Sequence, residues 1–167
     1  MAVTASARLA SAPEDDVPRL TRKTVFAIEA VLDIAYNGGP EPAQSREITR
    51  RQGIPTRYLE QVLQQLVHAG ILTGVRGPRG GYRLARERRR ISVGEVVRVV
   101  RKMEEPKEQT DNVAGSALST EVVRPLWLEL QHEFEQKLDG VSIEDLCQRA
   151  HKAGVDSESA RRLNYMI

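Results

Sequence analysis

Apolar residues recur at helical spacing over most of this chain of 167 residues. Positions three and four residues apart predict helices over residues 21–37, 45–53, 56–69, 93–102, 120–138 and 143–150, with a weaker signal over 157–163. In the first of these helices, the predicted apolar face holds Val25, Ile28, Val31, Leu32 and Ala35. The segments 71–75 and 82–84 are expected to be short strands, and because they flank a Gly- and Arg-rich segment they predict a β-hairpin. The expected fold class is therefore mainly α with a small β-hairpin.

Short polar residues mark where several of these helices begin. Thr21, Ser45 and Ser142 each stand at the start of a predicted helix. There, a side-chain oxygen can accept a hydrogen bond from the free backbone N–H groups of the first turn. Ser92 has the same position, and Glu95 three residues later completes a capping box. We therefore expect these four residues to be helix N-caps.

The predicted helix 56–69 has one apolar and one polar side. The apolar side, at about 100° per residue, gathers Leu59, Val62, Leu63 and Leu66. The polar side carries Arg57, Gln61, Gln64 and His68, with Glu60 and Gln65 beside them. Arginine and glutamine side chains can form paired hydrogen bonds with base edges in a DNA major groove. An ordinary solvated face is the alternative, and the segment that follows favours DNA.

That segment is the loop of the predicted hairpin, Arg76-Gly77-Pro78-Arg79-Gly80-Gly81. Its glycines allow the backbone to approach a partner closely, and its arginines can contact phosphates or a minor groove. A nucleotide-phosphate loop is excluded because such a loop joins a strand to a helix, whereas this one joins two strands. Two helices, a tight turn at Gly53 and a basic hairpin, in this order, predict a winged helix-turn-helix unit that binds DNA.

The distribution of charge supports a polyanionic partner. The whole chain has a net charge of +2, but residues 76–90 contain seven arginines and one acid, a local charge of +6. The alternative for residues 86–90 is a solvated charged loop. Arg22 and Lys23 lie in the first turn of the first helix, where basic side chains are unfavourable beside the helix dipole. A bound phosphate would relieve that conflict, and two solvated side chains are the alternative.

The predicted helix 120–138 carries an apolar stripe longer than its own domain can easily cover. The stripe consists of Val123, Leu126, Trp127, Leu130, Phe134 and Leu138. A helix of this kind commonly packs against its counterpart in a second subunit, so we expect a homodimer. Packing onto its own domain is the alternative. Pro125 lies in the first turns and is expected to shift where the helix starts.

Composition excludes several classes of protein. No apolar run approaches the roughly 20 residues that span a membrane, and the acidic N-terminal segment 1–17 lacks the apolar core of a secretory signal. The single cysteine, Cys147, cannot form an internal disulfide, as expected in the reducing cytoplasm. No combination of carboxylates, or of Ser or Cys with His, has a spacing that predicts catalysis. We therefore expect a DNA-binding protein and not an enzyme.

Several runs of sequence together resemble one protein family. They are Leu20-Thr21, Ala30-Val31-Leu32-Asp33-Ile34-Ala35, Tyr58-Leu59-Glu60-Gln61, Gly70-Ile71-Leu72, Val75-Arg76-Gly77-Pro78, Gly80-Gly81-Tyr82-Arg83-Leu84-Ala85, Ile91-Ser92-Val93-Gly94-Glu95-Val96-Val97 and Leu126-Trp127-Leu128-Glu129. Over about residues 19–150 the chain resembles the Rrf-two family of bacterial transcription regulators, which are IscR-, NsrR- and CymR-like proteins.

The resemblance implies a homodimeric regulator, expected to be a repressor, that binds double-stranded DNA at a palindromic operator. It implies that the helix 56–69 enters the major groove and that the hairpin is a wing that reaches the minor groove. The residues that would face DNA are Thr56, Arg57, Tyr58, Glu60 and Gln61 on the helix and Arg76, Gly77, Pro78, Gly80 and Gly81 in the wing. To these we add Arg22, Lys23, Ser45, Gln64 and Arg79 from their own positions in the sequence.

The chain departs from the family pattern at three places. Many members hold an iron–sulfur cluster through three cysteines in the segment that corresponds to 104–117, which contains no cysteine here, so we expect no cofactor and no metal. The usual Gly-Arg-Tyr of the first helix is Thr24-Val25-Phe26, which removes one basic contact. The wing carries Arg79 where glycine is usual, which adds one.

The expected domain organisation follows these assignments. It comprises a flexible arm (1–18), the winged domain (19–103), a mobile loop (104–117), the dimerisation helix with a short capping helix (118–152) and a tail (153–167). Three kinds of signal remain open: oxidation of Cys147, a small molecule bound between the winged domain and the long helix, or a partner protein. A lone cysteine is more often a small core side chain than a sensor.

Overall fold

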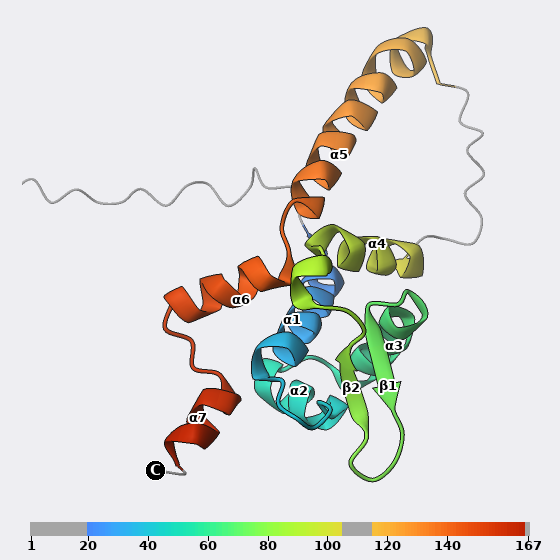
Figure 1. Cartoon of the computed structure of the whole chain (residues 1–167). Helices are drawn as coiled ribbons and strands as arrows, with labels where there is room; N and C mark the ends of the chain where they lie inside the picture. Colours follow the sequence, from blue (N-terminus) through green and yellow to red (C-terminus); the bar gives the residue numbers. More distant parts are fainter. Residues whose placement is uncertain (1–19, 105–114, 166–167) are drawn as a thin grey trace, which may run out of the picture.

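A computed structural model describes residues 20–104 and 115–165 (Figure 1). The predicted arm 1–18 and most of the predicted loop 104–117 lie outside these residues. The elements, in chain order, are α1 (Arg22–Asn37), α2 (Ser45–Gln52), α3 (Thr56–His68), β1 (Leu72–Val75), β2 (Gly81–Leu84), η1 (Arg88–Arg90), α4 (Val93–Glu104), η2 (Ser119–Val123), α5 (Arg124–Asp139), α6 (Ile143–Lys152) and α7 (Glu158–Asn164). The prediction of a mainly helical fold with one hairpin is confirmed. Among the described residues, none of the helices combines the length and the apolar character needed to cross a membrane.

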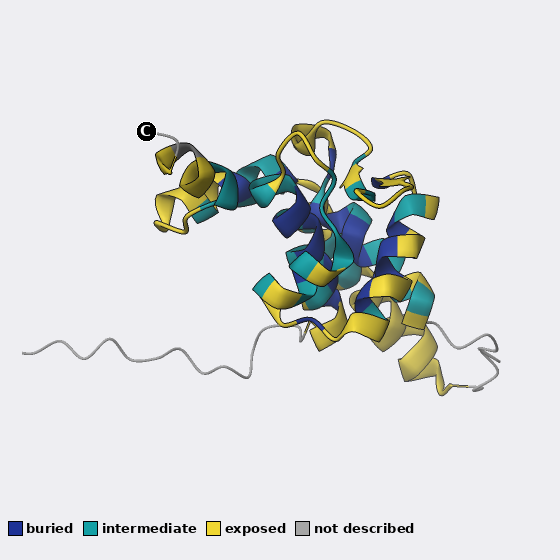
Figure 2. Ribbon diagram, turned by 90° about the horizontal axis from the view of Figure 1, so that it is seen from below, coloured by how far each residue is buried: buried dark blue, intermediate teal, exposed yellow. Residues whose placement is uncertain are grey.

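The core lies where α1, α3 and α4 meet under the hairpin. The predicted apolar side of α3 is confirmed, because Leu59, Val62, Leu63 and Leu66 are all buried. Helix α4 contributes the buried residues Val93, Val96, Val97 and Val100. Figure 2 shows the buried residues gathered in this region, whereas α5 is exposed along most of its length. The same buried cluster extends to Ile143 and Cys147 of α6, and burial of its aliphatic side chains stabilises the winged domain.

Helix α1 is buried on a face that differs from the predicted one. Of the five predicted apolar positions, Val31 alone is fully buried, and Val25 is exposed. The fully buried positions include Ala27 and Ala30. The reason is that α1 contacts α2, α3, α4, α6 and β2, and small side chains permit the closest approach of so many neighbours. The helical spacing of apolar residues points to the face with the largest side chains. It does not reveal which face of the helix packs most closely against other elements.

The turn between α2 and α3 depends on a glycine. Gly53 ends α2 with φ of 67°, a left-handed conformation that costs glycine little, and its N–H bonds to the carbonyl of Thr49. The prediction that Ser45 caps α2 is wrong. Gln44 is the N-cap, with reciprocal hydrogen bonds between it and Glu47 in a capping box, and Ser45 is the first helical residue. The N–H of Glu47 donates to the backbone carbonyl of Gln44 at 3.0 Å, and the N–H of Gln44 donates to the Glu47 carboxylate at 3.4 Å.

Proline shapes the start of the long helix. Pro125 has no N–H to bond to the carbonyl four residues back, and its ring crowds that carbonyl. The preceding turn, η2, widens to a π-helix in which the N–H of Arg124 bonds to the carbonyl of Ser119. The expected shift in the helix start is confirmed as this widened turn. From this distant start α5 runs toward the winged domain and reaches it beside α4 (Figure 1).

The C-terminal end of α5 is tied to α4. Arg98 pairs with Asp139 at 2.9 Å, and Arg101 pairs with Glu135. Antiparallel backbone pairing between Ser92 and Ser142 joins the starts of α4 and α6. The predicted N-caps Thr21, Ser92 and Ser142 all accept a hydrogen bond from a backbone N–H of their helix. After α6, the segment predicted as a tail contains α7, which contacts the winged domain.

Candidate nucleic-acid interface

The outward side of α3 is free of intramolecular cover. The exposed side chains are Thr56, Arg57, Glu60, Gln61, Gln64, Gln65 and His68. They alternate with four fully buried leucines and valines, so the helix cannot rotate without moving these residues out of the core. The structure therefore presents the predicted polar stripe on a rigid support.

Tyr58 is the predicted α3 residue whose side chain turns inward. Its hydroxyl donates a 2.7 Å hydrogen bond to the backbone carbonyl of Lys23. Its ring lies 6.1 Å from the ring of Phe26, at an interplanar angle of 49°. Burial, with a smaller contribution from the charge of Glu104, raises the pKa of Tyr58 to about 12. Tyr58 thus joins the start of α3 to the start of α1.

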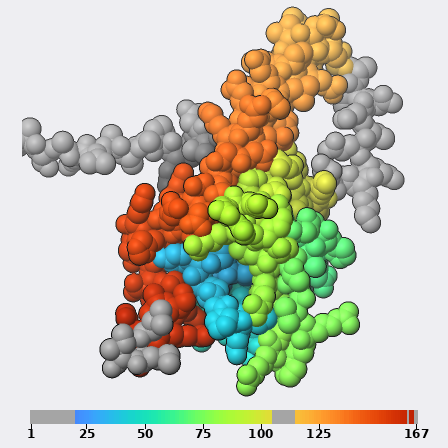
Figure 3. All heavy atoms as spheres, in the orientation of Figure 1, coloured from blue at the N-terminus to red at the C-terminus, as the bar shows by residue number. Residues whose placement is uncertain are grey.

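The wing is a short antiparallel hairpin. Leu72 pairs with Leu84 and Val75 with Gly81, and the loop between the strands holds the predicted Arg76-Gly77-Pro78-Arg79-Gly80. Arg76 and Arg79 are both exposed. In the space-filling view, the side chains of the hairpin project from the lower right of the body (Figure 3). Two arginines on a projecting loop are suited to contact phosphates.

The base of the wing is fixed to the loop between α1 and α2. Ala43 and Tyr82 exchange two backbone hydrogen bonds, of 2.9 and 2.8 Å. A Cβ atom at Gly81 would lie 2.3 Å from the carbonyl oxygen of Ala43, so this position has no room for a side chain. Arg83 adds a hydrogen bond to the carbonyl of Pro40. These contacts place the wing next to the first residue of α2, the predicted DNA contact Ser45.

The basic segment 76–90 divides into two parts. On the wing, Arg79 lies 3.7 Å from Glu41, with 87% of its side chain still exposed, so this pair is weak. Beyond the wing, Arg86 pairs with Glu95 at 2.8 Å, and Arg88 pairs with Glu144. The second part therefore holds η1 against α4 and α6, and the first part remains available to a ligand.

The start of α1 contributes the two further basic residues that we predicted. Arg22 and Lys23 are exposed. Lys23 lies 3.9 Å from Glu104 at the end of α4, a long and largely exposed contact. Because Tyr58 bonds to the carbonyl of Lys23, this pair of residues is held beside the start of α3.

The apolar stripe on the long helix is uncovered in the single chain. The exposed fractions of Val123, Leu126, Trp127 and Leu130 lie between 49% and 68%. Trp127, Leu130 and Phe134 line a groove of about 680 Å³, with Val97 of α4 and Leu20 on its other side. A large exposed apolar surface of this kind commonly marks a place where another molecule binds.

Cys147 is part of the core. Its side chain is 3% exposed and packs in the same cluster as Ile143. Burial raises the pKa of the Cys147 thiol, and the nearby charge of Arg88 lowers it by less. A thiol that stays protonated is a poor nucleophile.

Comparison with known proteins identifies the family. Residues 20–149 match a family described as "Rrf2: Iron-dependent Transcriptional regulator". The chain belongs to the Rrf2 family. It is a DNA-binding transcription regulator with a winged helix-turn-helix fold, which confirms the resemblance in the sequence. The matched segment ends inside α6, so α7 lies outside it.

Individual relatives agree with this assignment. The chain is 34% identical to the HTH-type transcriptional regulator IscR of Aliivibrio salmonicida over 128 residues, which cover 77% of this chain and 76% of that protein. The structure of T. potens IscR superposes with a TM-score of 0.66 at 31% identity, covering 84% of this chain and 94% of that one. The structure of CymR, described as the global cysteine regulator of B. subtilis, superposes with a TM-score of 0.62 at 25% identity, covering 80% of this chain and 98% of that one.

The donor groups of this chain do not fit iron held by thiolates. The sequence contains one cysteine, and Cys147 is buried in the core. Within residues 20–104 and 115–165, no group of three or more His, Cys, Asp or Glu side chains could hold a metal ion. Cluster ligation requires several thiolates, so the iron of the family description has no matching site among these residues.

One important group was missing from our sequence-based site. Asp33 of α1 has a fully buried side chain and accepts hydrogen bonds from Arg51 and Gln52, the last two residues of α2. A lone acid in an otherwise apolar stretch of a helix, as in Val31-Leu32-Asp33-Ile34, is a signal that could have pointed to a buried partner.

Proposed function

We propose that this regulator acts as a homodimeric repressor that binds a palindromic operator without a thiolate-ligated iron cluster. The observation that carries the proposal is the combination of an exposed Arg/Gln face on α3 with an exposed arginine wing on one rigid domain. In a helix-turn-helix dimer, the two recognition helices read half-sites about 34 Å apart, one turn of DNA. The uncovered stripe of α5 supports the dimer.

Each part of the interface has a distinct role in the proposal. Arg57, Glu60 and Gln61 select bases, because their side chains carry hydrogen-bonding groups on the outward side of α3. Arg76 and Arg79 supply affinity that falls with salt, because their charges replace the counterions of phosphates. We assign Ser45, Gln64, Arg22 and Lys23 to the same contact surface, because Gln64 is exposed on α3, Arg22 and Lys23 are exposed at the start of α1, and Ser45 begins α2.

A titration tests the DNA-binding residues. Fluorescence anisotropy would measure binding to a labelled fragment from upstream of the protein's own gene, for the wild type and for Arg76→Ala, Gln61→Ala and Arg149→Ala. Arg149 is an exposed basic residue on α6 and serves as the control. We expect Arg76→Ala to weaken binding and to reduce the slope of log K against log salt by about 1. Gln61→Ala should weaken operator binding by about 1–3 kcal/mol with an unchanged slope. If both variants bind like the control, the site assignment is wrong.

Sedimentation tests the dimer. Trp127 is 68% exposed in the single chain, so Trp127→Glu should leave the winged domain folded. We expect the wild type to sediment as a dimer and Trp127→Glu as a monomer, because a charge at a closely packed apolar interface is unpaired and desolvated. A wild type that remains monomeric at micromolar concentration contradicts the dimer.

The groove of about 680 Å³ supports a second candidate, a regulator controlled by a small apolar ligand. The groove lies between α4 and α5, where the sequence analysis left room for an effector. Under this proposal, a ligand would change operator affinity, and Leu20→Asn on the groove wall, outside the proposed dimer stripe, would abolish that response while the affinity without ligand stays the same. A screen of apolar ligands that leaves operator affinity unchanged would remove this candidate.

A further inference from the structure

The C-terminal segment, outside the family match, packs on the winged domain at one corner. In α7, the N–H of Glu158 bonds to the side-chain oxygen of Asn37 at 3.0 Å. The hydroxyl of Tyr36 donates to the carbonyl of Val155 at 2.5 Å. Both partners lie at the end of α1. The segment is therefore held by specific hydrogen bonds and not by apolar burial alone.

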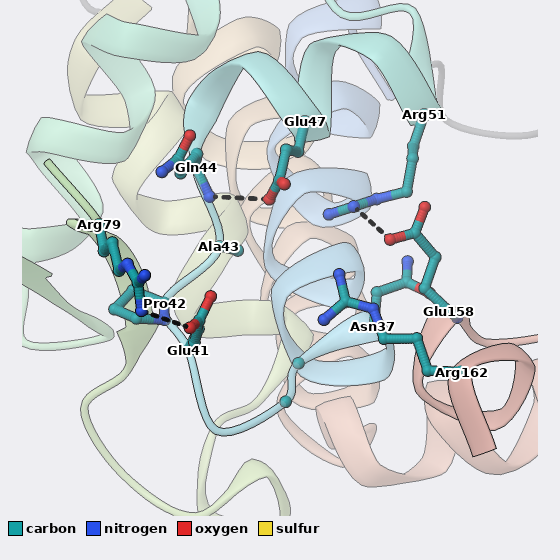
Figure 4. A pocket seen from close by; sticks show the side chains of 12 residues that line it. Asn37, Glu41, Pro42, Ala43, Gln44, Glu47, Arg51, Arg79, Glu158 and Arg162 are labelled. Carbon is teal, nitrogen blue, oxygen red and sulfur yellow. Dashed lines mark hydrogen bonds and ion pairs between the residues drawn. The ribbon is translucent and has the colours of Figure 1, made fainter. Parts of the chain in front are cut away.

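The centre of this corner is Arg51, which bridges two carboxylates. Its Nε and Nη2 atoms donate to the two oxygens of Asp33 at 2.9 and 2.6 Å, and its Nη1 donates to Glu158 at 3.1 Å. The side chain of Asp33 is fully buried, that of Arg51 is 14% exposed and that of Glu158 is 30% exposed. Figure 4 shows Arg51 and Glu158 pointing toward one another. The guanidinium group thus joins α1, α2 and α7.

The position of Arg51 along the chain connects this corner to DNA binding. Arg51 and Gln52 are the last residues of α2, and Asp33 holds both. Gly53 follows directly, and α3 begins at Thr56. The direction in which α3 leaves the turn therefore depends on how firmly the end of α2 is held against α1.

The same corner also borders the wing. A cavity between α7 and the wing is lined by Glu158 and Arg162 on one side and by Glu41 and Arg79 on the other (Figure 4). Both sides carry one acid and one base, so the cavity has no net preference for a charged ligand. Its position shows that α7 lies on the wing side of the domain.

We propose that Glu158 is a positioning residue for operator binding: through Arg51, the C-terminal segment fixes the turn that orients α3. This inference rests on the proposed function. When this turn is loose, only a fraction of the molecules hold α3 in the geometry that binds DNA. The apparent affinity for operator falls in proportion to that fraction. Glu158 itself does not touch DNA in this account.

Three variants test the proposal. Glu158→Gln keeps the size of the side chain and removes its charge. A chain that ends at Gly154 removes the whole segment. Asp156→Asn is the matched control, because Asp156 is exposed in the same segment and, among the described residues, pairs with no cation. For each variant, operator affinity would be measured over a range of salt, together with backbone hydrogen exchange in the free protein.

We expect Glu158→Gln and the shortened chain to bind operator about three- to tenfold more weakly, with an unchanged salt slope. Exchange should become faster at residues 50–57 and stay the same in α4. Asp156→Asn should behave as the wild type. A fall in the salt slope would overturn the proposal in favour of direct phosphate contact by α7. Unchanged affinity, or faster exchange across the whole domain, would overturn it in favour of a purely structural role.

Failure of the proposed function would be separable from failure of this inference. If the wild type binds no operator, the proposed function fails, and the exchange measurement still decides whether Glu158 fixes the turn. Unchanged exchange at residues 50–57 in both Glu158→Gln and the shortened chain would overturn the positioning role, whatever the DNA result.

Discussion

Replacing Asp33 by alanine should destabilise the winged domain strongly. The Asp33 carboxylate is fully buried and accepts four hydrogen bonds, two from Arg51 and one each from Gln52 and Asn37. The hydrogen bonds that Arg51 itself donates to Asp33, together with the negative charge of Asp33, raise the pKa of Arg51. Removing one partner of a buried ion pair costs about 3–5 kcal/mol, because the other charge is left unpaired. Because Glu158 still contacts Arg51 in the variant, we expect a loss of stability at the lower end of this range, about 3 kcal/mol.

Urea unfolding followed by circular dichroism measures this loss. For a domain of this size, about 3 kcal/mol corresponds to a fall in Tm of about 6–12 °C. Asp156→Ala, which removes an exposed carboxylate, should change the stability by less than about 0.5 kcal/mol. A loss below about 1 kcal/mol for Asp33→Ala would refute the reasoning, since it would mean that the end of α2 is not held by this carboxylate.

A double replacement separates the charge from the packing. Asp33→Leu with Arg51→Met removes both charges and keeps apolar volume at the corner. Such exchanges of a whole buried pair are often neutral or stabilising. We therefore expect the double variant to be more stable than Asp33→Leu alone. If the single variant Asp33→Leu and the double variant were equally stable, the charge of Arg51 would be solvated or paired by other groups when Asp33 is absent.

Three further predictions concern single side chains. Tyr58→Phe should lower stability by about 1 kcal/mol in urea unfolding at pH 7, because it removes the hydroxyl that donates to the carbonyl of Lys23. The pKa of Tyr58 in the folded protein, about 12, exceeds the ordinary 10.0, so the stability that its neutral form contributes is complete below pH 10 and is lost as the pH rises toward 12. Over this pH range the variant should therefore lose less stability than the wild type. The buried Cys147 thiol, whose pKa is raised, should react with a thiol reagent at least about tenfold more slowly in the native protein than in urea, and equal rates would contradict its burial. The hydrogen bond from Arg101 lowers the pKa of Glu135, and hydrogen bonds from Ser142 lower the pKa of Asp145. Thermal unfolding should therefore show a stability that is constant above about pH 5 and that declines as the pH falls through these lowered pKa values. A stability that rises on acidification would contradict this.

Local signals in the sequence located much of the fold. The caps at Thr21, Ser92 and Ser142 are visible because each links residues no more than three apart, which any helix brings together. The two sides of α3 are visible because four apolar residues follow one helical period. The loop of the wing is visible because its glycines and arginines exclude burial.

The remaining features depend on contacts between distant parts of the chain. Arg51 and Glu158 are separated by 107 positions, and Tyr58 and Lys23 by 35, so no local pattern links them. The choice of Gln44 over Ser45 as the N-cap depends on how the preceding loop is held by the wing through Ala43. In each case the decisive partner is set by the packing of elements and not by neighbouring residues.

Selection of DNA from a random library by the purified protein tests the central claim most directly. Several rounds of enrichment and sequencing reveal the preferred site, and the operator sequence does not have to be chosen beforehand. We expect an inverted repeat whose two halves are centred about one DNA turn apart, and we expect Gln61→Ala to alter the preference within each half. Pools that remain random, or a preferred site without two-fold symmetry, would contradict a homodimer that reads DNA through α3.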